Sequence, residues 1–432
     1  MKRVSAIILA LCAIGQVCAQ QIYRSEFSIF DTREDAIKND HTKTERHLRF
    51  APKKLETVDN IVVMGQTVNT PIAWSDYNVY LHIQNCFKAY DLVVNEQLVA
   101  SVEDPHTPAD FLLSSFLRQG DNEILLLVRE SQCKELNKGS KANTVEQFEG
   151  SYLFAQHRKH IFDYDVRIVQ QEKKLALELD VTVRNDFNFE EGVQVGYDIY
   201  SPDNKLVDYG VRDFTVAGRS LDTLPIRISL GEETRYLWSD KSPKLYRITL
   251  YIKRDGKPRE YNTFNVGAGT STFANGKLLR NGVAVDVKSA RYNATSTYEQ
   301  ALADIKTLKA KGINTLLPDN PQPEWFYDIC DILGVYVIER ANINPTENAD
   351  NRKIGGTPSN DPTLLGDYIT RVKAMYYRTR NHSCIIAYAL GGDAAGNGYN
   401  MYKAYQWLKS VEKSRAIICT SADGEWNSDV NL

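Results

Sequence analysis

One carboxylate stands at a place where proteins commonly carry out chemistry. Asp393 follows the apolar run at residues 384–388, whose pattern predicts a buried strand. The same loop contains Gly396 and Gly398, so the favoured interpretation of Asp393 is a polar residue that precedes the next helix.

Cysteine chemistry is the second possibility that the residue types raise. The chain contains 7 Cys, of which Cys12 and Cys18 fall in the leader segment at the amino terminus. The other positions are Cys86, Cys133, Cys330, Cys384 and Cys419. An odd set cannot pair completely, and the spacing matches no metal motif. We expect buried free thiols and no cofactor, with a Cys86–Cys133 disulfide as the open alternative.

The residues after Gly282 alternate between predicted strands and helices. A helix opens at the capping-box pattern of Ser296 and Glu299 and ends at Gly312. Further helices are expected at 326–334, 364–380 and 400–411, and strands at 286–290, 314–317, 335–338, 384–388 and 417–419. Repeated strand–helix units favour a parallel sheet with right-handed crossovers.

The preceding part of the chain is predicted to be rich in β-structure. Residues 20–155 contain short apolar strands, such as 79–83 and 123–128, and this spacing suggests a sandwich or jelly roll. Residues 160–266 contain a strictly alternating strand at 175–183 and several more strands. That region fits an immunoglobulin-like sandwich.

The amino terminus has the pattern of a secretory leader. Lys2 and Arg3 precede an apolar run at 6–14, and small residues end at Ala19. The run is too short to span a bilayer, since a spanning helix needs ~20 apolar residues. We therefore expect export to the periplasm or cell surface, with a lipid anchor on Cys18 as a weaker alternative. No transmembrane segment is expected, and the net charge of −3 gives no footprint for nucleic acid.

A series of motifs recurs in a fixed order along the chain. They are Trp238-Ser239 with 243–246, then 275–282, 326–339, 341–343, 378–386, and 407–411 with Ser414-Arg415. In order and spacing they resemble glycoside hydrolase family 2, the β-galactosidase family, over roughly residues 77–432. After the leader, which we take as a signal peptide at 1–19, the resemblance implies three domains: a jelly-roll, galactose-binding-like domain at 20–157, an immunoglobulin-like β-sandwich at 158–267 and a C-terminal α/β partial TIM barrel at 268–432.

The resemblance also implies a reaction and the groups that would perform it. The family cleaves β-glycosides with an acid/base and a nucleophile, two carboxylates about 5 Å apart. Asp393 stands at the acid/base position, where the family has Glu, and Gly392 replaces an Asn that holds the sugar 2-hydroxyl. A displacement of about 1 Å can cost ~100-fold in rate. The family's nucleophile would fall beyond residue 432.

Other positions of the family's site have changed as well. Arg291, Tyr292 and Asn293 replace Arg-His-Glu, Leu317 and Asp319 replace Arg-x-x-His, and Arg340, Asn344 and Thr346 replace carboxylate and histidine positions. No metal site is therefore expected. Asn381, His382 and Tyr388 remain as candidate sugar-binding residues. In the family Asn381 and His382 brace the end of a strand, and for them a structural role is the favoured interpretation.

These departures predict a protein that keeps the fold without its chemistry. The favoured hypothesis is a glycan-binding or scaffolding component of the cell envelope without enzymatic activity. The alternatives are a weakly active β-galactosidase-like glycosidase that uses Asp393, and a truncated gene product without function. We expect the parallel sheet to be open at 286–290 and 417–419 and to be covered by a protein partner or by self-association. The tail at 421–432 is short and polar and is expected to cover it poorly.

Overall fold

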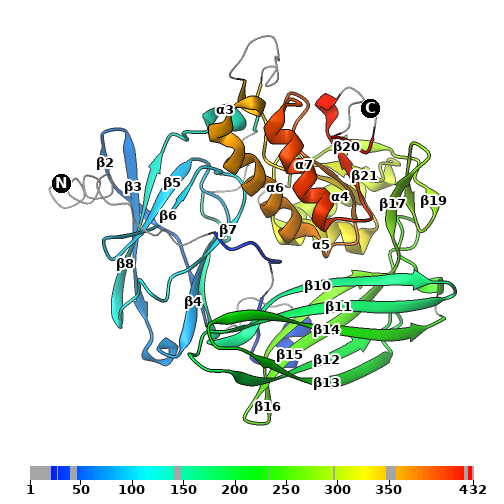
Figure 1. Cartoon of the computed structure of the whole chain (residues 1–432), viewed down its shortest axis with the longest axis horizontal. Coiled ribbons are helices and arrows are strands. Elements are labelled where there is room, and N and C mark those ends of the chain that lie inside the picture. Colours follow the sequence, from blue (N-terminus) through cyan, green and yellow to red (C-terminus); the bar gives the residue numbers. More distant parts are fainter. Residues whose placement is uncertain are drawn as a thin grey trace. The chain divides into compact units, whose positions relative to one another are not determined.

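The computed structural model describes residues 21–26, 28–38, 46–140, 147–232, 234–294, 297–346, 357–422 and 427–430. The predicted leader at residues 1–19 lies outside these ranges, and so does Ser296 of the predicted capping box. The chain divides into two compact units (Figure 1). The first comprises Met1–Tyr23, Arg46–Asn137 and Val145–His157, and the second comprises Arg24–Glu45, Lys138–Thr144 and Arg158–Leu432.

The first unit consists of two antiparallel sheets. One contains β1 (His47–Arg49), β9 (Tyr152–His157), β4 (Tyr77–Ile83) and β7 (Ala109–Leu112), in that order. The other contains β2 (Lys53–Val58), β3 (Ile61–Thr70), β8 (Gly120–Arg129), β5 (Ala89–Val94) and β6 (Gln97–Val102), in that order, and α3 (Lys134–Asn137) follows β8. The two sheets face each other, because Leu81 and Phe111 of one share a buried cluster with Leu92 and Leu126 of the other.

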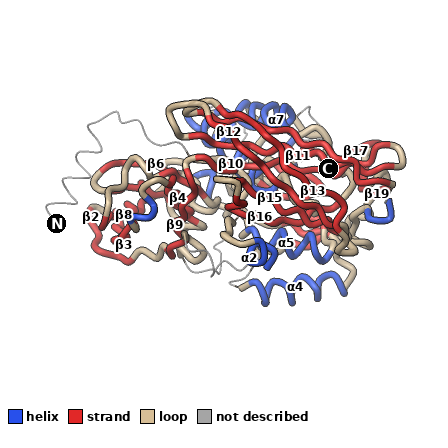
Figure 2. Tube along the Cα trace, turned by 90° about the horizontal axis from the view of Figure 1, so that it is seen from below, coloured by secondary structure: helices blue, strands red, loops and turns tan. Residues whose placement is uncertain are grey.

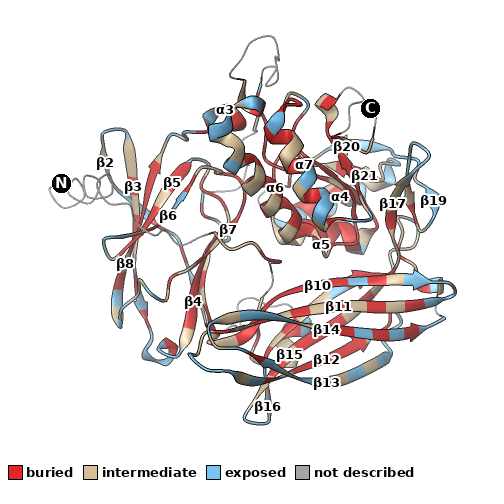
Figure 3. Ribbon diagram, viewed as in Figure 1, coloured by how far each residue is buried: buried red, intermediate tan, exposed pale blue. Residues whose placement is uncertain are grey.

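A second pair of antiparallel sheets opens the main part of the second unit. One sheet has the order β10 (Lys159–Gln171), β11 (Lys174–Asn185), β14 (Ser220–Gly231). The other has the order β13 (Leu206–Val216), β12 (Glu191–Tyr200), β15 (Leu245–Arg254), β16 (Lys257–Gly267), and α2 (Arg33–Lys38) precedes both. Every second residue of β11 is buried, as the alternation predicts, and Figure 3 shows buried positions along this strand. The buried residues share a core with Val195 and Ile248.

A parallel sheet with its helices completes the second unit. A small antiparallel sheet of β17 (Ser271–Ala274), β18 (Lys277–Arg280) and β19 (Val283–Ala284) leads into it. The parallel strands lie in sequence order: β20 (Ser289–Arg291), β21 (Thr315–Leu317), β22 (Tyr336–Arg340), β23 (Ile385–Ala389) and β24 (Ala416–Ile418). The helices are α4 (Tyr298–Ala310), α5 (Glu324–Leu333), α6 (Leu365–Thr379) and α7 (Tyr399–Val411). The predicted strand–helix alternation after residue 282 is confirmed by the order of these elements along the chain, and Figure 2 labels α4, α5 and α7 among the helices.

Local sequence sets the ends of these helices. At the start of α4, Thr297 accepts a hydrogen bond from the Gln300 N–H through its hydroxyl at 3.2 Å, so it satisfies one of the unpaired amides of the first turn. At the end of α5, Gly334 has a φ of 67° and turns the chain toward β22. Glycine suits that left-handed conformation because it has no Cβ.

The cysteines behave as the favoured interpretation predicts. Cys86, Cys133, Cys330, Cys384 and Cys419 are all buried, and none of these five forms a disulfide. The alternative of a Cys86–Cys133 disulfide is therefore wrong. Burial also raises the pKa of the Cys86 thiol to about 12, which leaves it protonated and unreactive at neutral pH.

The edge of the parallel sheet at β24 is hydrogen-bonded rather than bare. Ile417 N donates to Asp429 Oδ2 at 2.9 Å, and Cys419 N donates to Ser428 Oγ at 3.0 Å. The Asp429 N–H donates in turn to the Ile417 carbonyl at 2.8 Å. The expectation of unpaired backbone groups at this edge is therefore wrong, because polar side chains of residues 427–430 stand in for a neighbouring strand.

Replacing Asp429 tests how much this side-chain cap stabilises the sheet. Asp429 also accepts hydrogen bonds from the Tyr405 hydroxyl (2.8 Å) and Lys409 Nζ (2.6 Å) of α7. We expect Asp429→Ala to lower the free energy of unfolding by about 1–3 kcal/mol, because the Ile417 N–H loses its acceptor. Asp429→Asn keeps an oxygen for Ile417 and should lose less. Urea unfolding followed by circular dichroism measures both, and equal losses would contradict the cap.

Candidate functional site

Polar side chains gather at the ends of the parallel strands. Arg291 is the last residue of β20, and Arg340 is the last residue of β22. Asp319 lies in the loop after β21, and Asp393 lies in the loop after β23. Parallel strands present their carboxyl ends at the same edge, which is where barrel enzymes place their chemistry. This edge is therefore the candidate site.

Asp319 is the centre of the group. Its Oδ1 accepts hydrogen bonds from Arg291 Nη1 at 2.6 Å and from Arg340 Nη2 at 2.8 Å. Its Oδ2 accepts from Asn293 Nδ2 at 3.2 Å, and its backbone N–H donates to Asn293 Oδ1 at 2.9 Å. The Asp319 side chain is 5% exposed. A buried carboxylate with two guanidinium partners is held as an acceptor within the protein.

Asp393 is the exposed member of the group. Its side chain is 70% exposed, and its Oδ2 accepts a hydrogen bond from Arg291 Nη2 at 2.7 Å. Arg291 bridges the carboxylates of Asp393 and Asp319. The pKa of Arg291 is raised, chiefly by its hydrogen bond to Asp319. A glycosidase acid/base must present its carboxyl group to the glycosidic oxygen. In this structure the carboxyl group of Asp393 is directed at a guanidinium of the protein instead.

The space next to Gly392 is occupied by Asn344. A Cβ on Gly392 would lie 2.7 Å from Asn344 Oδ1, closer than real Cβ atoms approach another atom. The same amide is fixed from its nitrogen, which donates to Asn342 Oδ1 at 3.0 Å and to the Asp319 carbonyl at 3.3 Å. No side chain fits at position 392 in this arrangement.

A distant segment of the second unit reaches the same loop. Gly139 N donates to the Asn344 carbonyl at 2.5 Å, and Ser140 Oγ donates to Asn342 Oδ1 at 2.8 Å. Ser140 Oγ also accepts from Asn344 Nδ2 at 3.2 Å. Sequence reasoning missed these residues, because a glycine and a serine in a polar stretch carry no signal for a partner so far along the chain.

His382 lies before β23, at the amino ends of the parallel strands. Its Nδ1 is 2.8 Å from Asp331 Oδ2, and its Nε2 is 2.9 Å from Glu324 Oε1. Burial opposes a charge on the ring, but the two carboxyl groups outweigh it and hold the pKa of His382 well above its ordinary value. Asp331 Oδ1 also accepts the Cys384 N–H at 2.6 Å. His382 therefore joins α5 to β23, which is a structural role.

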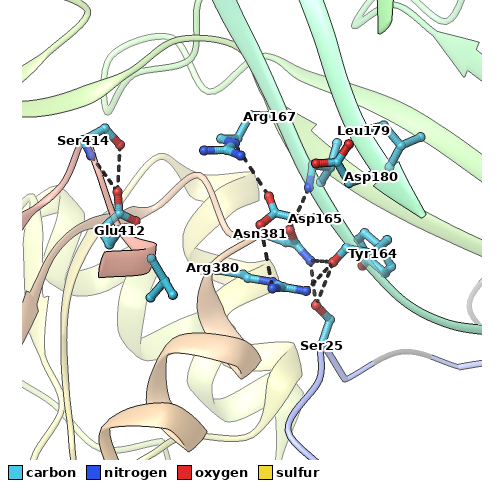
Figure 4. A network of polar contacts seen from close by, with 12 residues as sticks. Ser25, Tyr164, Asp165, Arg167, Leu179, Asp180, Arg380, Asn381, Glu412 and Ser414 are labelled. Carbon is cyan, nitrogen blue, oxygen red and sulfur yellow. Dashed lines mark hydrogen bonds and ion pairs between the residues drawn. The ribbon is translucent and has the colours of Figure 1, made fainter. Parts of the chain in front are cut away.

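Asn381 joins the parallel sheet to the sandwich of the same unit, as Figure 4 shows. Its Oδ1 accepts from Val166 N at 2.9 Å, and its Nδ2 donates to the Tyr164 carbonyl at 3.0 Å and to Ser25 Oγ at 2.7 Å. Arg380 Nη2 donates to the same Tyr164 carbonyl at 3.0 Å. The side-chain amide of Asn381 thus forms hydrogen bonds with the backbone of β10, as the backbone of a neighbouring strand would.

Tyr388, the third candidate sugar-binding residue, packs between the sheet and its helices. The ring is fully buried, and its centroid lies 5.8 Å from the ring of Tyr376 in α6. The hydroxyl accepts a hydrogen bond from Arg415 Nη1 at 3.3 Å. Burial raises the pKa of Tyr388. The structure thus places all three candidates in the supports of the sheet.

One group among the described residues could present three metal-ligating atoms. Donor atoms of Asp331, His382 and Cys384 lie within 4.8 Å of one another. Both oxygens of Asp331 already accept hydrogen bonds from the other two residues, so an ion would have to displace these bonds. At the opposite end of the strands, Arg340 and Asn344 both donate to Asp319. At both ends of the strands, these polar residues thus form hydrogen bonds with one another.

A buried carboxyl group that the sequence did not single out lies in β22. Glu339 is 1% exposed, and burial raises its pKa to about 7. The Tyr327 hydroxyl and the Arg378 guanidinium lower this pKa and offset the effect of burial only in part. Sequence reasoning missed Glu339 because the family motif that contains it was read for its apolar strand.

Glu339 should make the protein less stable as the pH rises. The pKa is about 7 in the folded state and about 4.3 in an unfolded chain. Its contribution is therefore fully present below about pH 4.3 and is lost as the pH rises through about 7. We expect Glu339→Gln to flatten the decline of the unfolding temperature between about pH 5 and pH 8. Parallel pH profiles for the two proteins would contradict this assignment.

The contact between Gly392 and Asn344 also makes a prediction about stability. We expect Gly392→Ala to lower the free energy of unfolding by about 1–3 kcal/mol, because the methyl group would press against the amide. Adding Asn344→Gly to that variant should recover part of the loss. Gly366→Ala is the matched control, since a Cβ there meets nothing within 4 Å. Chemical denaturation of the variants measures these differences. A Gly392→Ala protein as stable as the control would show that the contact imposes no constraint.

The sequence matches two profiles of one enzyme family. "Glycosyl hydrolases family 2" matches residues 159–268, and "Glycosyl hydrolases family 2, TIM barrel domain" matches residues 269–431. No helix among the described residues combines the length and apolar character that a bilayer crossing requires.

The chain is similar over most of its length to several proteins named as β-galactosidases. It is 26% identical over 385 residues to a β-galactosidase of Priestia megaterium, which covers 85% of this chain and 37% of that protein. It is 26% identical over 360 residues to a β-galactosidase of Streptococcus thermophilus, which covers 80% of this chain and 34% of that protein. The chain thus spans about a third of the length of these relatives.

Solved structures share the fold. A Bacteroides uniformis β-glucuronidase superposes with a TM-score of 0.69 at 15% identity, over 83% of this chain and 46% of that one. A glycosyl hydrolase family 2 member from Bacteroides cellulosilyticus superposes with a TM-score of 0.67 at 17% identity, over 83% of this chain and 49% of that one. Together with the two profile matches, these similarities show that the chain belongs to glycoside hydrolase family 2.

Proposed function

We propose that this chain is an exported, catalytically inactive family 2 protein that acts as a glycan-binding or scaffolding component of the cell envelope. The observation that carries the proposal is the ion pair between Asp393 and Arg291 at the family's acid/base position. An acid/base must transfer a proton to the leaving oxygen and later take one from water. A carboxylate engaged by the protein's own guanidinium is poorly placed for both steps.

The position next to Asp393 supports the same proposal. The family's sugar-binding amide at this point is replaced by Gly392, and Asn344 fills the adjoining space. Interactions made only in the transition state are what accelerate a reaction. With the amide absent and its place closed, a sugar bound here would lack a contact that the family's reaction uses.

A weakly active glycosidase is the second candidate function, because one observation favours it. The Asp393 side chain is 70% exposed, so a ligand can reach its carboxyl group. The Arg291 ion pair is partly solvated, and surface pairs of this kind are worth only about 0–1 kcal/mol. A substrate could displace it, and Asp393 would then act as the acid/base of a slow β-galactosidase-like enzyme.

The proposed architecture follows the family. We take residues 20–157 as a jelly roll, residues 158–267 as an immunoglobulin-like sandwich and residues 268–432 as the first part of a TIM barrel. The paired antiparallel sheets with shared cores in the first two segments support the sandwich assignments. The leader-like pattern at residues 1–19 supports export to the periplasm or cell surface.

Turnover of chromogenic glycosides tests the proposal. We expect no hydrolysis of β-galactosides, β-glucuronides or β-mannosides above the buffer rate, even at high protein concentration. Asp393→Ala should leave that null result unchanged. Measurable turnover that Asp393→Ala abolishes, and that the control Asp121→Ala on β8 retains, would establish the weakly active enzyme instead.

A glycan array separates the two forms of the inactive protein. Retention of specific glycans, weakened by Asp393→Ala and Arg291→Ala, would support glycan binding at the candidate site. Co-purification of an envelope protein without glycan retention would support scaffolding. The absence of both, in protein shown by circular dichroism to be folded, would overturn the proposal.

A further inference from the structure

Most edges of the described sheets are protected against pairing with another chain. Proteins cover the unpaired backbone groups of edge strands with lysine, proline, side chains or short strands. β2 carries Lys53 and a register shift, β14 carries Pro225, and β24 is capped by Asp429. Asn381 pairs with β10, and Phe30 forms a bridge to β16. β1, β7 and β20 are only three or four residues long.

β13 is a long edge strand, and no other described segment pairs with its outer side. Its register shift against β12 lies near the end of the strand, where Tyr200 faces Leu206. It is the outermost strand of the order β13-β12-β15-β16, and its 11 residues include no lysine and no proline. Three large apolar side chains on it are open to solvent: Leu206 is 50% exposed, Val207 is 37% exposed and Tyr209 is 69% exposed. An uncovered edge with exposed apolar side chains favours association with another strand.

Two backbone groups of β13 are covered by side chains next to them in the sequence. The Tyr209 N–H donates to Asp208 Oδ1 at 2.8 Å, and the Val211 carbonyl accepts from Arg212 Nη1 at 3.3 Å. Alternate residues of an edge strand direct their N–H and C=O groups away from the sheet. Tyr209 and Val211 belong to the same alternation, so both present these groups at the outer side of β13.

A second copy of β13 fits this edge in one antiparallel register, centred on Gly210. There Tyr209 faces Val211 of the partner subunit, and their backbone groups pair directly. The side chains of Asp208 and Arg212 give up their hydrogen bonds to the adjacent backbone of their own strand. Asp208 of one copy then lies opposite Arg212 of the other, and the two-fold axis forms this ion pair twice. Tyr209 against Val211 is also a favourable aromatic and β-branched pair.

Neighbouring registers lack this complementarity. With a two-fold axis perpendicular to the sheet, side chains on the same face of the two strands lie opposite each other. The axis must therefore pass through a residue and not between two residues, so each alternative register is centred on another residue of β13. Centring it on Asp208 or on Arg212 brings like charges together. Centring it on Val211 places Arg212 opposite Gly210 and leaves the charges unmatched.

We propose that this protein forms a two-fold symmetric dimer in which β13 of one copy pairs with β13 of the other, centred on Gly210. The four-stranded sheet then continues across both copies. The sequence placed self-association at the open side of the parallel sheet, whereas these contacts assign it to the sandwich. The dimer does not depend on the candidate site, so it stands or falls separately from the proposed function.

Charge reversal tests the proposal on the full chain. Light scattering after size-exclusion chromatography should show a concentration-dependent dimer. Asp208→Arg and Arg212→Asp each place like charges opposite one another twice, and each should weaken dimerisation by about tenfold or more. An equimolar mixture of the two variants restores opposite charges and should dimerise again, as should the double variant Asp208→Arg/Arg212→Asp.

Asp222→Arg is the matched control, because Asp222 lies on the edge strand β14 and accepts the N–H of its neighbour in the same way. It should dimerise like the unmodified protein. Circular dichroism reports whether each variant is folded. Asp208→Arg remains informative if Arg212→Asp is unstable, since Arg212 also donates to the Tyr197 hydroxyl. A monomeric unmodified protein, or a dimer insensitive to Asp208→Arg, would overturn the proposal.

Discussion

The second unit depends on the hydrogen bonds of one buried residue, Asp331. Its two oxygens accept from His382 Nδ1 and from the Cys384 N–H, and its backbone carbonyl accepts from Trp238 Nε1 at 2.9 Å. These bonds connect α5, the start of β23 and the connection between β14 and β15 of the sandwich. Removing one partner of such a buried network leaves the others unsatisfied, which costs more than the bond itself contributes.

The residues around His382 extend this joint in several directions. Asn381 pairs with β10, and Ser383 Oγ accepts the Gly267 N–H of β16 at 2.6 Å. The consecutive residues Asn381, His382 and Ser383 therefore connect the sandwich, α5 and the parallel sheet. The polar run at the start of β23 thus supports the fold at the end of the strands opposite to Asp393.

The sequence predicted the elements well because their signals are local. The alternation of β11 and the helix stop at Gly334 each depend on a few adjacent residues, and the structure has both. The family resemblance placed Arg291 and Asp393 at strand ends, but their ion pair joins residues from two separate loops. The cap of β24 was mispredicted for the same reason, since Asp429 was counted for its polarity and its hydrogen bonds with Ile417 follow only from the folded chain.

The close approach of Asn344 to Gly392 makes the residues at these two positions depend on each other. The Asn344 amide is anchored by Asn342 and by Ser140 from a distant segment, so it cannot easily move aside. A larger residue at position 392 would be less destabilising once Asn344 had been replaced by a smaller residue. Substitutions at the two positions should therefore be non-additive, because the free-energy cost of a side chain at position 392 depends on which residue occupies position 344.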